Sequence, residues 1–326
     1  MKIAFFSTQP YDRTYFEKNN SAHEISFLNV PLDETTVLLA AGFNVVCSFV
    51  NDKLDLPVIM ELKRLGVKLI AQRCAGFNNV NTVAARDNNI VVVRVPAYSP
   101  HAVAEHALAL IMTLNRKTHK AYNRVREGNF SLDRLTGFDI YGKTVGVIGT
   151  GKIGLCFANI MLGLGCTVLA FDPNVDNAAA SSGIKYLPLK QVLQDSDIVS
   201  LHCPLTEQSK HLINSTTLSL MKKGAMLINT SRGGLLDTKA VIVALKNETL
   251  GYVGIDVYEQ EEKLFFHDLN EQVINDDVLI RLLGFPNVLI TSHQGFLTEE
   301  ALTQIALVTL QNITDFEQGK PLANEV

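Results

Sequence analysis

Short apolar runs alternate with segments of helical patterning along almost the whole chain. A buried strand of a parallel sheet is apolar throughout, whereas an amphipathic helix repeats its apolar residues every three or four positions. The runs with the strand pattern are Lys2–Ser7, Ile25–Val30, Val45–Phe49, Lys68–Gln72, Val91–Val95, Thr144–Gly149, Thr167–Phe171, Asp197–His202, Ala225–Thr230, Tyr252–Val257 and Val288–Thr291. Because these runs are continuously apolar, we expect parallel sheets covered by helices on both faces, which is the α/β class.

Helices are predicted between most of these runs. The clearest segments are Leu56–Leu65, Lys152–Leu164, Leu189–Gln194, Thr216–Met221 and Thr238–Lys246. A longer helix, rich in Ala and Leu, is predicted over His101–Asn123, and the last helix over Thr298–Gln318. The long helix has apolar residues on more than one side, which indicates either a homo-oligomer (dimer or tetramer) or burial inside one subunit.

Two prolines in Pro96–Pro100 interrupt the regular structure and mark a domain boundary. A chain of 326 residues is long enough for two domains with separate cores. We expect a first domain over residues 1–99, completed by a C-terminal helix within 298–326, and a second domain over 100–297. The active site would lie in a cleft between them, which closes by hinge motion near Pro96–Pro100 and Phe296–Thr298.

Composition and charge narrow the class of protein. The chain is 47% hydrophobic and 19% charged with a formal net charge of −4, which is typical of a soluble globular protein and gives no footprint for nucleic acid. No apolar stretch has the length of a membrane span or the form of a signal peptide. The five cysteines are scattered without a C-x-x-C pair. We therefore expect no disulfide framework, no metal site and a reducing, cytoplasmic location.

A glycine-rich turn, Gly149-Thr-Gly-Lys-Ile-Gly154, separates a predicted strand from a predicted helix. Gly149 allows a sharp turn, Gly151 leaves room for a pyrophosphate, and Gly154 lets the helix approach the strand. The backbone N–H groups of Lys152 and Ile153 lie at the start of the helix, where they can point toward phosphates. The turn is either purely structural or part of a dinucleotide site, and its flanking strands favour the dinucleotide.

The strand after this turn ends at Asp172, where a carboxylate can accept hydrogen bonds from ribose hydroxyl groups. The same negative charge would repel a 2′-phosphate, so the sequence predicts NAD rather than NADP. His202 ends the predicted strand Asp197–His202, and Cys203 and Pro204 follow it; we expect these residues to line the cofactor rather than to react.

Three further strands are followed by charged or titratable residues. Arg232 comes after one strand and His293 after another, while the acidic residues Glu259, Glu261 and Glu262 follow a third. Because ligands bind at the carboxyl ends of parallel strands, these side chains are expected to meet beside the cofactor. Each of these residues also has a simpler interpretation. Arg232 could form a surface ion pair, His293 could be a hydrogen-bonded histidine at a strand end, and any single Glu of the acidic run could be solvated.

An arginine, a carboxylate and a histidine together suit hydride transfer to a 2-keto acid. Reduction of the ketone forms an alkoxide that must be protonated, and histidine is well suited to deliver this proton near neutral pH. A neighbouring carboxylate orients the imidazolium and favours its charge. The planar fork of arginine pairs with the carboxylate of the substrate.

These motifs resemble those of the D-isomer-specific 2-hydroxyacid dehydrogenase family over essentially the whole chain. They are Gly149–Gly154 with Asp172, Ser200–Thr206, Asn229–Gly234, Gly254–Glu259 and Ser292–Thr298. The segments most similar to the fermentative D-lactate branch of the family are Val95–Pro100, Val103–His106, Leu264–Asp268 and His293–Phe296. The resemblance implies a Rossmann-type cofactor domain, a flavodoxin-like substrate domain, and NAD-dependent, reversible reduction of pyruvate to D-lactate.

The resemblance also assigns roles that the pattern alone leaves open. It implies that Glu261 is the catalytic carboxylate, with Asp256 in support. It places Arg232 on the carboxylate and the carbonyl of the substrate, and it makes His293 the acid and base. No nucleic-acid or membrane partner follows from it.

Substrate and cofactor contacts follow from the same resemblance. The loop at Ala75 and Gly76 would bind the carboxylate of the substrate, and Tyr98 and Phe296 would close a small pocket over its side chain. The residues expected to bind NAD are Gly149, Gly151, Lys152, Ile153, Gly154, Asp172, His202, Cys203, Pro204, Thr230, Ser231 and Asp256.

Two positions depart from the usual family pattern. Glu262 stands where many members have Pro, and Asn81 stands where many have Asp. The first departure weakens an assignment to phosphoglycerate or glyoxylate. Two alternatives stay open: a larger 2-keto acid as the substrate, and an NAD(H)-sensing regulatory protein built on the same fold.

Overall fold

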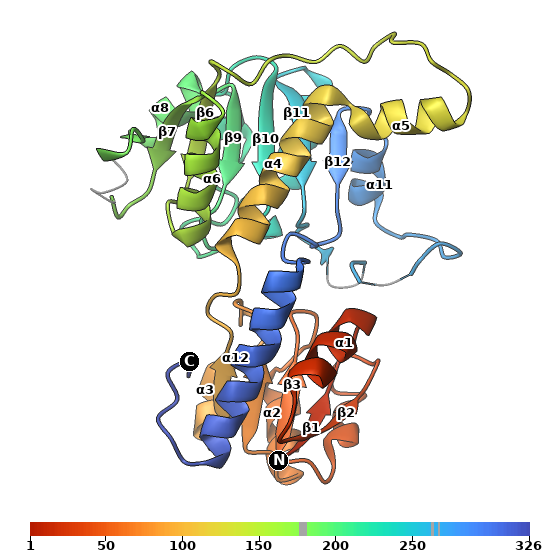
Figure 1. The fold of residues 1–326 in the computed structure, drawn as a ribbon, viewed down its shortest axis with the longest axis vertical. Coiled ribbons are helices and arrows are strands. Elements are labelled where there is room, and N and C mark those ends of the chain that lie inside the picture. The colour runs from red at the N-terminus through yellow and green to blue at the C-terminus, as the bar shows by residue number, and fades with distance from the viewer. Residues whose placement is uncertain (176–180, 262–263, 267) are drawn as a thin grey trace. The chain divides into compact units, whose positions relative to one another are not determined.

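The computed structural model describes all residues from 1 to 326 except 176–180, 262–263 and 267. The chain divides into two compact units (Figure 1). The first unit comprises Met1–Ser99 together with Leu297–Val326, and the second comprises Pro100–Phe296. In the described part of the chain, no helix is both long enough and apolar enough to cross a membrane.

The first unit is a five-stranded parallel sheet with helices on its faces. Its elements are β1 (Lys2–Phe5), α1 (Pro10–Asn19), β2 (Glu24–Phe27), η1 (Val37–Ala40), β3 (Val45–Ser48), α2 (Leu56–Arg64), β4 (Leu69–Gln72), α3 (Thr82–Asp87), β5 (Val91–Arg94) and α12 (Glu299–Glu317). The strand order is β2-β1-β3-β4-β5, which is the flavodoxin-like order. The C-terminal helix α12 packs against α1 and against β4 and β5, so the end of the chain completes the unit formed by its beginning.

The second unit is a seven-stranded parallel sheet. Its strands are β6 (Thr144–Ile148), β7 (Thr167–Phe171), β8 (Lys185–Tyr186), β9 (Ile198–Leu201), β10 (Ala225–Asn229), β11 (Leu250–Ile255) and β12 (Val288–Ile290). Its helices are α4 (Pro100–Arg116), α5 (Thr118–Arg126), α6 (Lys152–Gly163), α8 (Leu189–Asp195), α9 (Ser215–Leu218), η2 (Gly233–Leu235), α10 (Thr238–Lys246) and α11 (Asp277–Leu283). The order β12-β11-β10-β9-β6-β7-β8 places the first strand, β6, between β7 and β9, as in a Rossmann fold. Both sheets confirm the predicted fold class.

Apolar strands carry the core of each unit, as the patterning predicts. Helices α4 and α6 cover one face of the larger sheet, where Val145, Val147 and Phe157 are fully buried. The other face packs against α10 and α11, around Leu227 and Val241. Burial on both faces is the reason that these strands are continuously apolar.

The single long helix predicted over His101–Asn123 is wrong, because the chain forms two helices, α4 and α5. Lys117 between them has a φ of 50°, a left-handed conformation that ends the helical hydrogen bonding. The Asn115 side chain accepts from the backbone N–H of Phe138 and donates to its C=O, which fixes the chain where α4 ends. Helix α5 and the segment after it stand away from the sheet (Figure 1).

Smaller differences concern short elements. The two-residue strand β8 and the helices α1, α3 and α11 were not predicted, and α9 is shorter than the predicted Thr216–Met221. Helix α1 is mostly polar, so its pattern gives little signal; it is recognised in the structure by Pro10 at its first position and by a capping box at Gln9.

Candidate active site

The glycine-rich turn between β6 and α6 is shaped by the absence of side chains. Gly149 has a φ of 94°, and a Cβ there would lie 2.6 Å from the backbone nitrogen of Cys203. A Cβ on Gly154 would lie 2.0 Å from the carbonyl oxygen of Gly149, so only glycine allows the helix to start this close to the strand. No atom of the residues that the structure describes lies within 4 Å of a Cβ on Gly151, which leaves open space beside the exposed helix start at Lys152. The turn can therefore accept a phosphate group.

Asp172, at the end of β7, is hydrogen bonded to this turn. Its Oδ2 accepts from the backbone N–H of Thr150 at 2.7 Å, and its Oδ1 accepts from the backbone N–H of Asn174 at 2.8 Å. The Tyr186 hydroxyl donates to Thr150 Oγ1 at 3.0 Å. These bonds fix the carboxylate at the rim of the turn, where it can still accept bonds from a ribose through its remaining lone pairs.

A cavity of about 500 Å³ lies beside Asp172. It is lined by Ile148, Gly149, Phe171, Asp172, Pro173, Leu189, Cys203, Pro204 and Leu212 together with the polar residues Asn174, Thr206, Gln208 and Ser209. The lining therefore combines apolar side chains with the Asp172 carboxylate and several neutral polar groups. A flat aromatic base linked to a ribose matches this combination of apolar surface and hydrogen-bonding groups.

His202 and Cys203 follow β9, on the opposite side of the glycine-rich turn from β7. Burial lowers the pKa of His202 to about 3, so its ring is neutral near neutral pH and cannot serve as an acid there. The ring is hydrogen bonded to Ser200 Oγ at 2.8 Å. Burial raises the pKa of the Cys203 thiol to about 11, so the thiol is protonated at neutral pH. Both residues line the site without supplying acid–base chemistry.

Thr230, at the end of β10, has a buried hydroxyl oxygen without a hydrogen-bond partner among the described residues. A buried polar atom of this kind usually pairs with protein, water or ligand. The next residue, Ser231, donates from Oγ to the carbonyl oxygen of Cys203 at 2.7 Å, which ties the end of β10 to the loop after β9. A polar group of a bound dinucleotide would satisfy Thr230, so the residues present suit such a cofactor.

Arg232 continues from this strand end in an extended conformation. Its Nη1 donates to the carbonyl oxygen of Ser231 at 2.6 Å, and the Asn229 side chain donates to the carbonyl oxygen of Arg232 at 2.9 Å. A Cβ on Gly233 would lie 2.1 Å from the carbonyl carbon of Tyr258. The glycine therefore lets the turn that carries Arg232 pack directly on the backbone after β11, where the acidic run begins.

Glu261 and His293 form the main ion pair of the site. Glu261 Oε1 lies 2.7 Å from Nδ1 of His293, and Glu261 Oε2 accepts from the backbone N–H of Tyr258 at 2.8 Å. Their side chains are 18% and 19% exposed, so the pair is accessible from one side. Glu259 instead contacts His211 at 2.7 Å, and Glu262 lies outside the described residues.

Asp256 lies beneath the turn that carries His293 and is 1% exposed. Its carboxylate accepts from the backbone N–H groups of Gln294 and Gly295 and from Thr291 Oγ1. Burial opposes its charge, but hydrogen bonds from His106 and Thr291 hold the pKa of Asp256 below its usual range. The backbone C=O of Asp256 also accepts from the N–H of His293, which has a φ of 53°. Asp256 therefore orients the His293 turn, and its predicted contact with the cofactor stays a prediction.

His106 also belongs to this cluster, although no role in the site was predicted for it. This residue lies on α4, and its Nε2 is 3.0 Å from Thr291 Oγ1 and 3.3 Å from Asp256 Oδ1. The sequence pointed to this residue only through the motif Val103–His106, which is similar to the family's motif. That similarity does not indicate which residues the histidine contacts.

The predicted substrate loop belongs to the first unit. Ala75 and Gly76 follow β4 and are half-buried, and Tyr98 follows β5. The carbonyl oxygen of Ala75 accepts from Nη1 of Arg94 at 2.9 Å. Phe296, predicted to close the substrate pocket, is buried at the end of the second unit. Among the residues that the structure describes, no group of three His, Cys, Asp or Glu side chains is placed to hold a metal ion.

A family model described as "D-isomer specific 2-hydroxyacid dehydrogenase, NAD binding domain" matches residues 108–295. The chain belongs to the D-isomer specific 2-hydroxyacid dehydrogenase family. It is 52% identical to D-lactate dehydrogenase of Escherichia coli (strain K12) over 328 residues, which cover all of both chains. It is 54% identical to 2-hydroxyacid dehydrogenase A of Aspergillus oryzae, over all of this chain and 95% of that protein. The chain also matches the solved apo-structure of D-lactate dehydrogenase from Escherichia coli with a TM-score of 0.92. The two sequences are 50% identical, and the match covers 100% of each chain.

Membership of this dehydrogenase family confirms the resemblance found in the motifs. The protein is an NAD-dependent oxidoreductase, and the predicted cofactor is confirmed as NAD. The matched range contains the glycine-rich turn, Asp172, Arg232, Glu261 and His293.

Proposed function

We propose that this dehydrogenase reduces pyruvate to D-lactate and regenerates NAD, and that it catalyses the reverse reaction as well. The observation that carries the proposal is the 2.7 Å pair of Glu261 and His293, on the sheet edge that also bears Arg232. The relative from Escherichia coli, named D-lactate dehydrogenase, supports the choice of substrate.

In this proposal, His293 transfers the proton. Its Nδ1 faces Glu261, so Nε2 is the nitrogen that donates to the carbonyl oxygen of the substrate during reduction and accepts from the hydroxyl group during oxidation. Glu261 keeps the ring in this orientation and balances the charge of the imidazolium. The bond from Tyr258 N–H to Glu261 and the bonds to Asp256 keep both partners in place.

Arg232 binds the carboxylate of the substrate and polarises its carbonyl group. Its bond to the Ser231 carbonyl and the close packing at Gly233 fix the direction in which the guanidinium leaves the backbone. Arg232→Lys keeps the charge but loses the planar fork, so we expect kcat/KM for pyruvate to fall by roughly two orders of magnitude. Backbone N–H groups at Ala75 and Gly76 would bind the same carboxylate, with Tyr98 and Phe296 limiting the substrate side chain.

NAD would be held at the glycine-rich turn and in the adjoining cavity. Gly149, Gly151 and Gly154 make room for the pyrophosphate, which the backbone N–H groups of Lys152 and Ile153 would bind. The other residues proposed to contact the cofactor are Asp172, His202, Cys203, Pro204, Thr230, Ser231 and Asp256. When bound in its reduced form, the cofactor supplies the hydride.

The decisive experiment measures the oxidation of NADH by absorbance with a panel of 2-keto acids. We expect pyruvate to give the highest kcat/KM, and its product to be oxidised by a D-specific but not by an L-specific lactate dehydrogenase. A higher kcat/KM with 2-ketoisocaproate or phenylpyruvate would replace pyruvate by a larger substrate. No turnover with any acid would favour an NAD(H)-binding regulatory protein.

We also propose that the protein is a cytoplasmic homo-oligomer, a dimer or a tetramer. Most apolar residues of α4 give little support for this, because Ala104, Ala107, Leu110, Ile111 and Leu114 are buried within the second unit. Leu108 is half-buried, and Met112 is 39% exposed. Support comes instead from α5 and the segment after it. Helix α5 has no buried residue, and the exposed apolar side chains of this region are Tyr122, Val125, Phe130 and Leu132.

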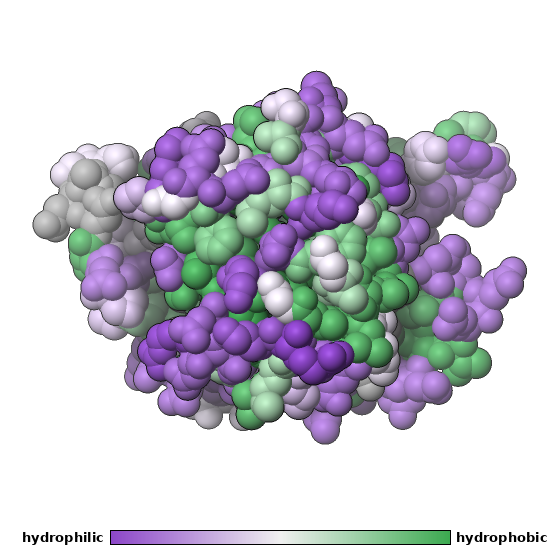
Figure 2. Space-filling view, turned by 90° about the horizontal axis from the view of Figure 1, so that it is seen from below, coloured by the Kyte–Doolittle hydropathy of each residue, from purple (hydrophilic) through white to green (hydrophobic). Residues whose placement is uncertain are grey.

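A second copy of the chain is the proposed partner of this surface. Exposed apolar residues also occur elsewhere, among them Leu38, Leu39 and Met60 of the first unit, and the face seen in Figure 2 shows apolar areas bordered by polar side chains. Sedimentation at micromolar concentration should give a mass above that of one chain. The double substitution Phe130→Ser and Leu132→Ser should shift the mass toward the monomer, whereas a monomeric wild type would contradict the proposal.

A further inference from the structure

Arg94 connects two neighbouring strand ends in the first unit. It is the last residue of β5 and pairs in register with Gln72, the last residue of β4. Its Nη1 donates to the carbonyl oxygen of Ala75 at 2.9 Å, and its guanidinium lies 5.1 Å from the ring centroid of Phe77. The arginine therefore contacts the loop after β4 on both sides of Gly76.

The backbone of Arg94 is itself fixed by the C-terminal part of the chain. Its N–H donates to the carbonyl oxygen of Asn324 at 3.0 Å, and its C=O accepts from the Asn312 side chain at 2.9 Å. Asn324 also donates from its side chain to Asn312 Oδ1 at 2.8 Å, and Asn312 is 5% exposed on α12. The arginine is thus held at its backbone while its side chain reaches the loop.

Arg73, the other arginine next to this loop, differs from Arg94 because a carboxylate is paired with its charge. Arg73 is 1% exposed and forms an ion pair with Asp12 at 3.2 Å, so its charge is compensated inside the unit. Arg94 is half-buried, and no ion pair joins it to any carboxylate of the described residues. The charge of Arg94 is therefore the uncompensated one beside the loop.

We propose that Arg94 is a positioning residue for the carboxylate of the substrate, which rests on the function proposed above. A guanidinium bonded to the Ala75 carbonyl polarises the peptide group that joins Ala75 to Gly76, so the Gly76 N–H becomes a stronger donor. The contact with Phe77 restricts the other side of the loop. The positive charge also attracts an anionic substrate to the loop.

The test compares the full-length variants Arg94→Gln and Arg94→Lys with the wild type. The control is Arg86→Gln, because Arg86 lies on α3 of the same unit with its side chain 77% exposed. The measurements are kcat and KM for pyruvate, inhibition by oxamate as an unreactive analogue of pyruvate, the Kd of NADH by fluorescence, and Tm.

For Arg94→Gln, we expect KM for pyruvate and the inhibition constant of oxamate to rise together, each by about tenfold or more, while the Kd of NADH stays within about twofold. Arg94→Lys, which keeps the charge but not both contacts, should give an intermediate increase. Adding guanidinium at millimolar concentration should partly restore oxamate binding to Arg94→Gln. Arg86→Gln should match the wild type in all measurements.

Two results would overturn the role of Arg94. One is an unchanged KM and unchanged oxamate inhibition in Arg94→Gln while the wild type reduces pyruvate normally. The other is a joint fall in Tm, NADH affinity and kcat without rescue by guanidinium, which would make the residue purely structural. A wild type that neither reduces pyruvate nor binds oxamate would overturn the proposed function and the role of Arg94 together.

Discussion

The two units have related doubly wound sheets, but the points where their strand order reverses are built differently. In the second unit, the reversal between β6 and β9 carries Gly149 on one side and Cys203 on the other, beside a cavity of about 500 Å³. In the first unit, the reversal between β1 and β3 is filled by the chain's own polar side chains. Ser7 donates to Asp52 at 2.6 Å, and Arg73 is buried nearby, bonded to the carbonyl oxygen of Ser7.

Two buried charged residues, Asp52 and Arg73, occupy the strand-order reversal of the first unit. Asp52 also accepts from the backbone N–H groups of Leu32 and Phe49. The guanidinium of Arg73 lies 4.4 Å from the ring centroid of Phe5 and 4.6 Å from that of Phe49. The same topology therefore forms an open cavity in one unit and an internal polar cluster in the other, so the residues at the strand ends decide which.

The strongest test of this comparison is His293→Gln in the second unit. The proton transfer is assigned to the His293–Glu261 pair, whereas NADH binding is assigned to the strand-order reversal between β6 and β9. The variant should therefore lower kcat roughly a thousandfold, both for pyruvate reduction and for lactate oxidation. The Kd of NADH, measured by fluorescence, should stay unchanged. Equal losses of NADH binding and turnover would show that the two sites are not separable.

Arg73→Met tests the buried charged cluster at the strand-order reversal of the first unit, between β1 and β3. It would leave Asp12 buried without the cation that pairs with it and would remove the nearby positive charge from Asp52, so we expect the free energy of unfolding to fall by about 3 kcal/mol. Urea unfolding measures this loss, with the exposed Arg86→Gln as a control of unchanged stability. If the variant is as stable as the wild type, the ion cluster does not stabilise the first unit.

Asp172→Ala tests the strand-order reversal of the second unit, where a cavity lies beside Asp172. The wild type should prefer NADH to NADPH in kcat/KM, and the variant should narrow this preference by about tenfold through the KM of the cofactor, because one charge and its hydrogen bonds to the ribose are lost. Loss of the bond to Thr150 N–H should weaken NADH binding as well. A variant with an unchanged preference would place the ribose elsewhere.

The sequence predicted what depends on local pattern. Buried parallel strands are apolar runs, so all but the two-residue β8 could be located, and the glycine-rich turn with Asp172 indicated the cofactor. Contacts between distant segments could not be predicted this way. Asp12 and Arg73 are 61 positions apart and His106 and Thr291 are 185 apart, and no local pattern relates them.

The acidic run after β11 illustrates the same limit at short range. Pattern alone left Glu259, Glu261 and Glu262 equivalent, and the family resemblance was needed to choose among them. In the structure, Glu261 reaches His293 because its second oxygen accepts from the Tyr258 N–H, while Glu259 turns toward His211. The break at Lys117 was also unpredictable, because it depends on the bonds between Asn115 and Phe138.

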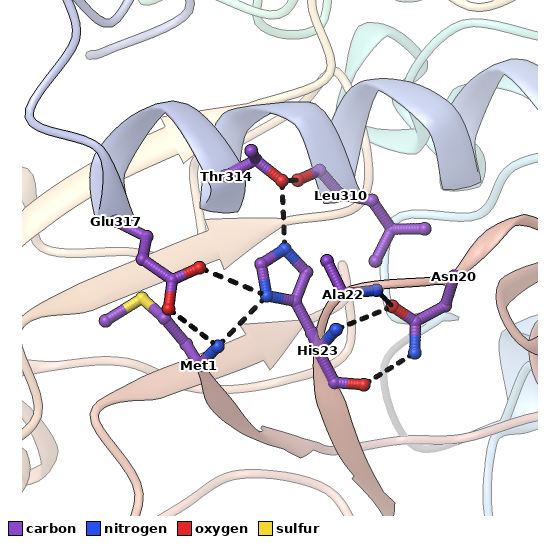
Figure 3. A network of polar contacts seen from close by, with 7 residues as sticks. All are labelled: Met1, Asn20, Ala22, His23, Leu310, Thr314 and Glu317. Carbon is purple, nitrogen blue, oxygen red and sulfur yellow. Dashed lines mark hydrogen bonds and ion pairs between the residues drawn. The ribbon is translucent and has the colours of Figure 1, made fainter.

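A smaller effect is expected from a second polar cluster of the first unit, which ties the N-terminus to α12 (Figure 3). The amino group of Met1 lies 3.1 Å from Nδ1 of His23 and 3.0 Å from Glu317 Oε1, and Nε2 of His23 lies 3.0 Å from Thr314 Oγ1. Burial, followed by the charge of the amino group, lowers the pKa of His23 from 6.5. The folded protein therefore holds this ring neutral, as an acceptor from the ammonium group.

Acidification should loosen this cluster. Because the pKa of His23 is lower in the folded state, its contribution to stability is fully present above about 6.5 and is lost as the pH falls through the lowered value. We expect the protection of β2 and α12 against hydrogen exchange, corrected for intrinsic rates, to decrease over that range. His23→Gln cannot titrate and should remove most of this pH dependence, whereas the exposed His101→Gln should keep it. If His23→Gln and the wild type lose protection equally on acidification, another group of the first unit carries the effect.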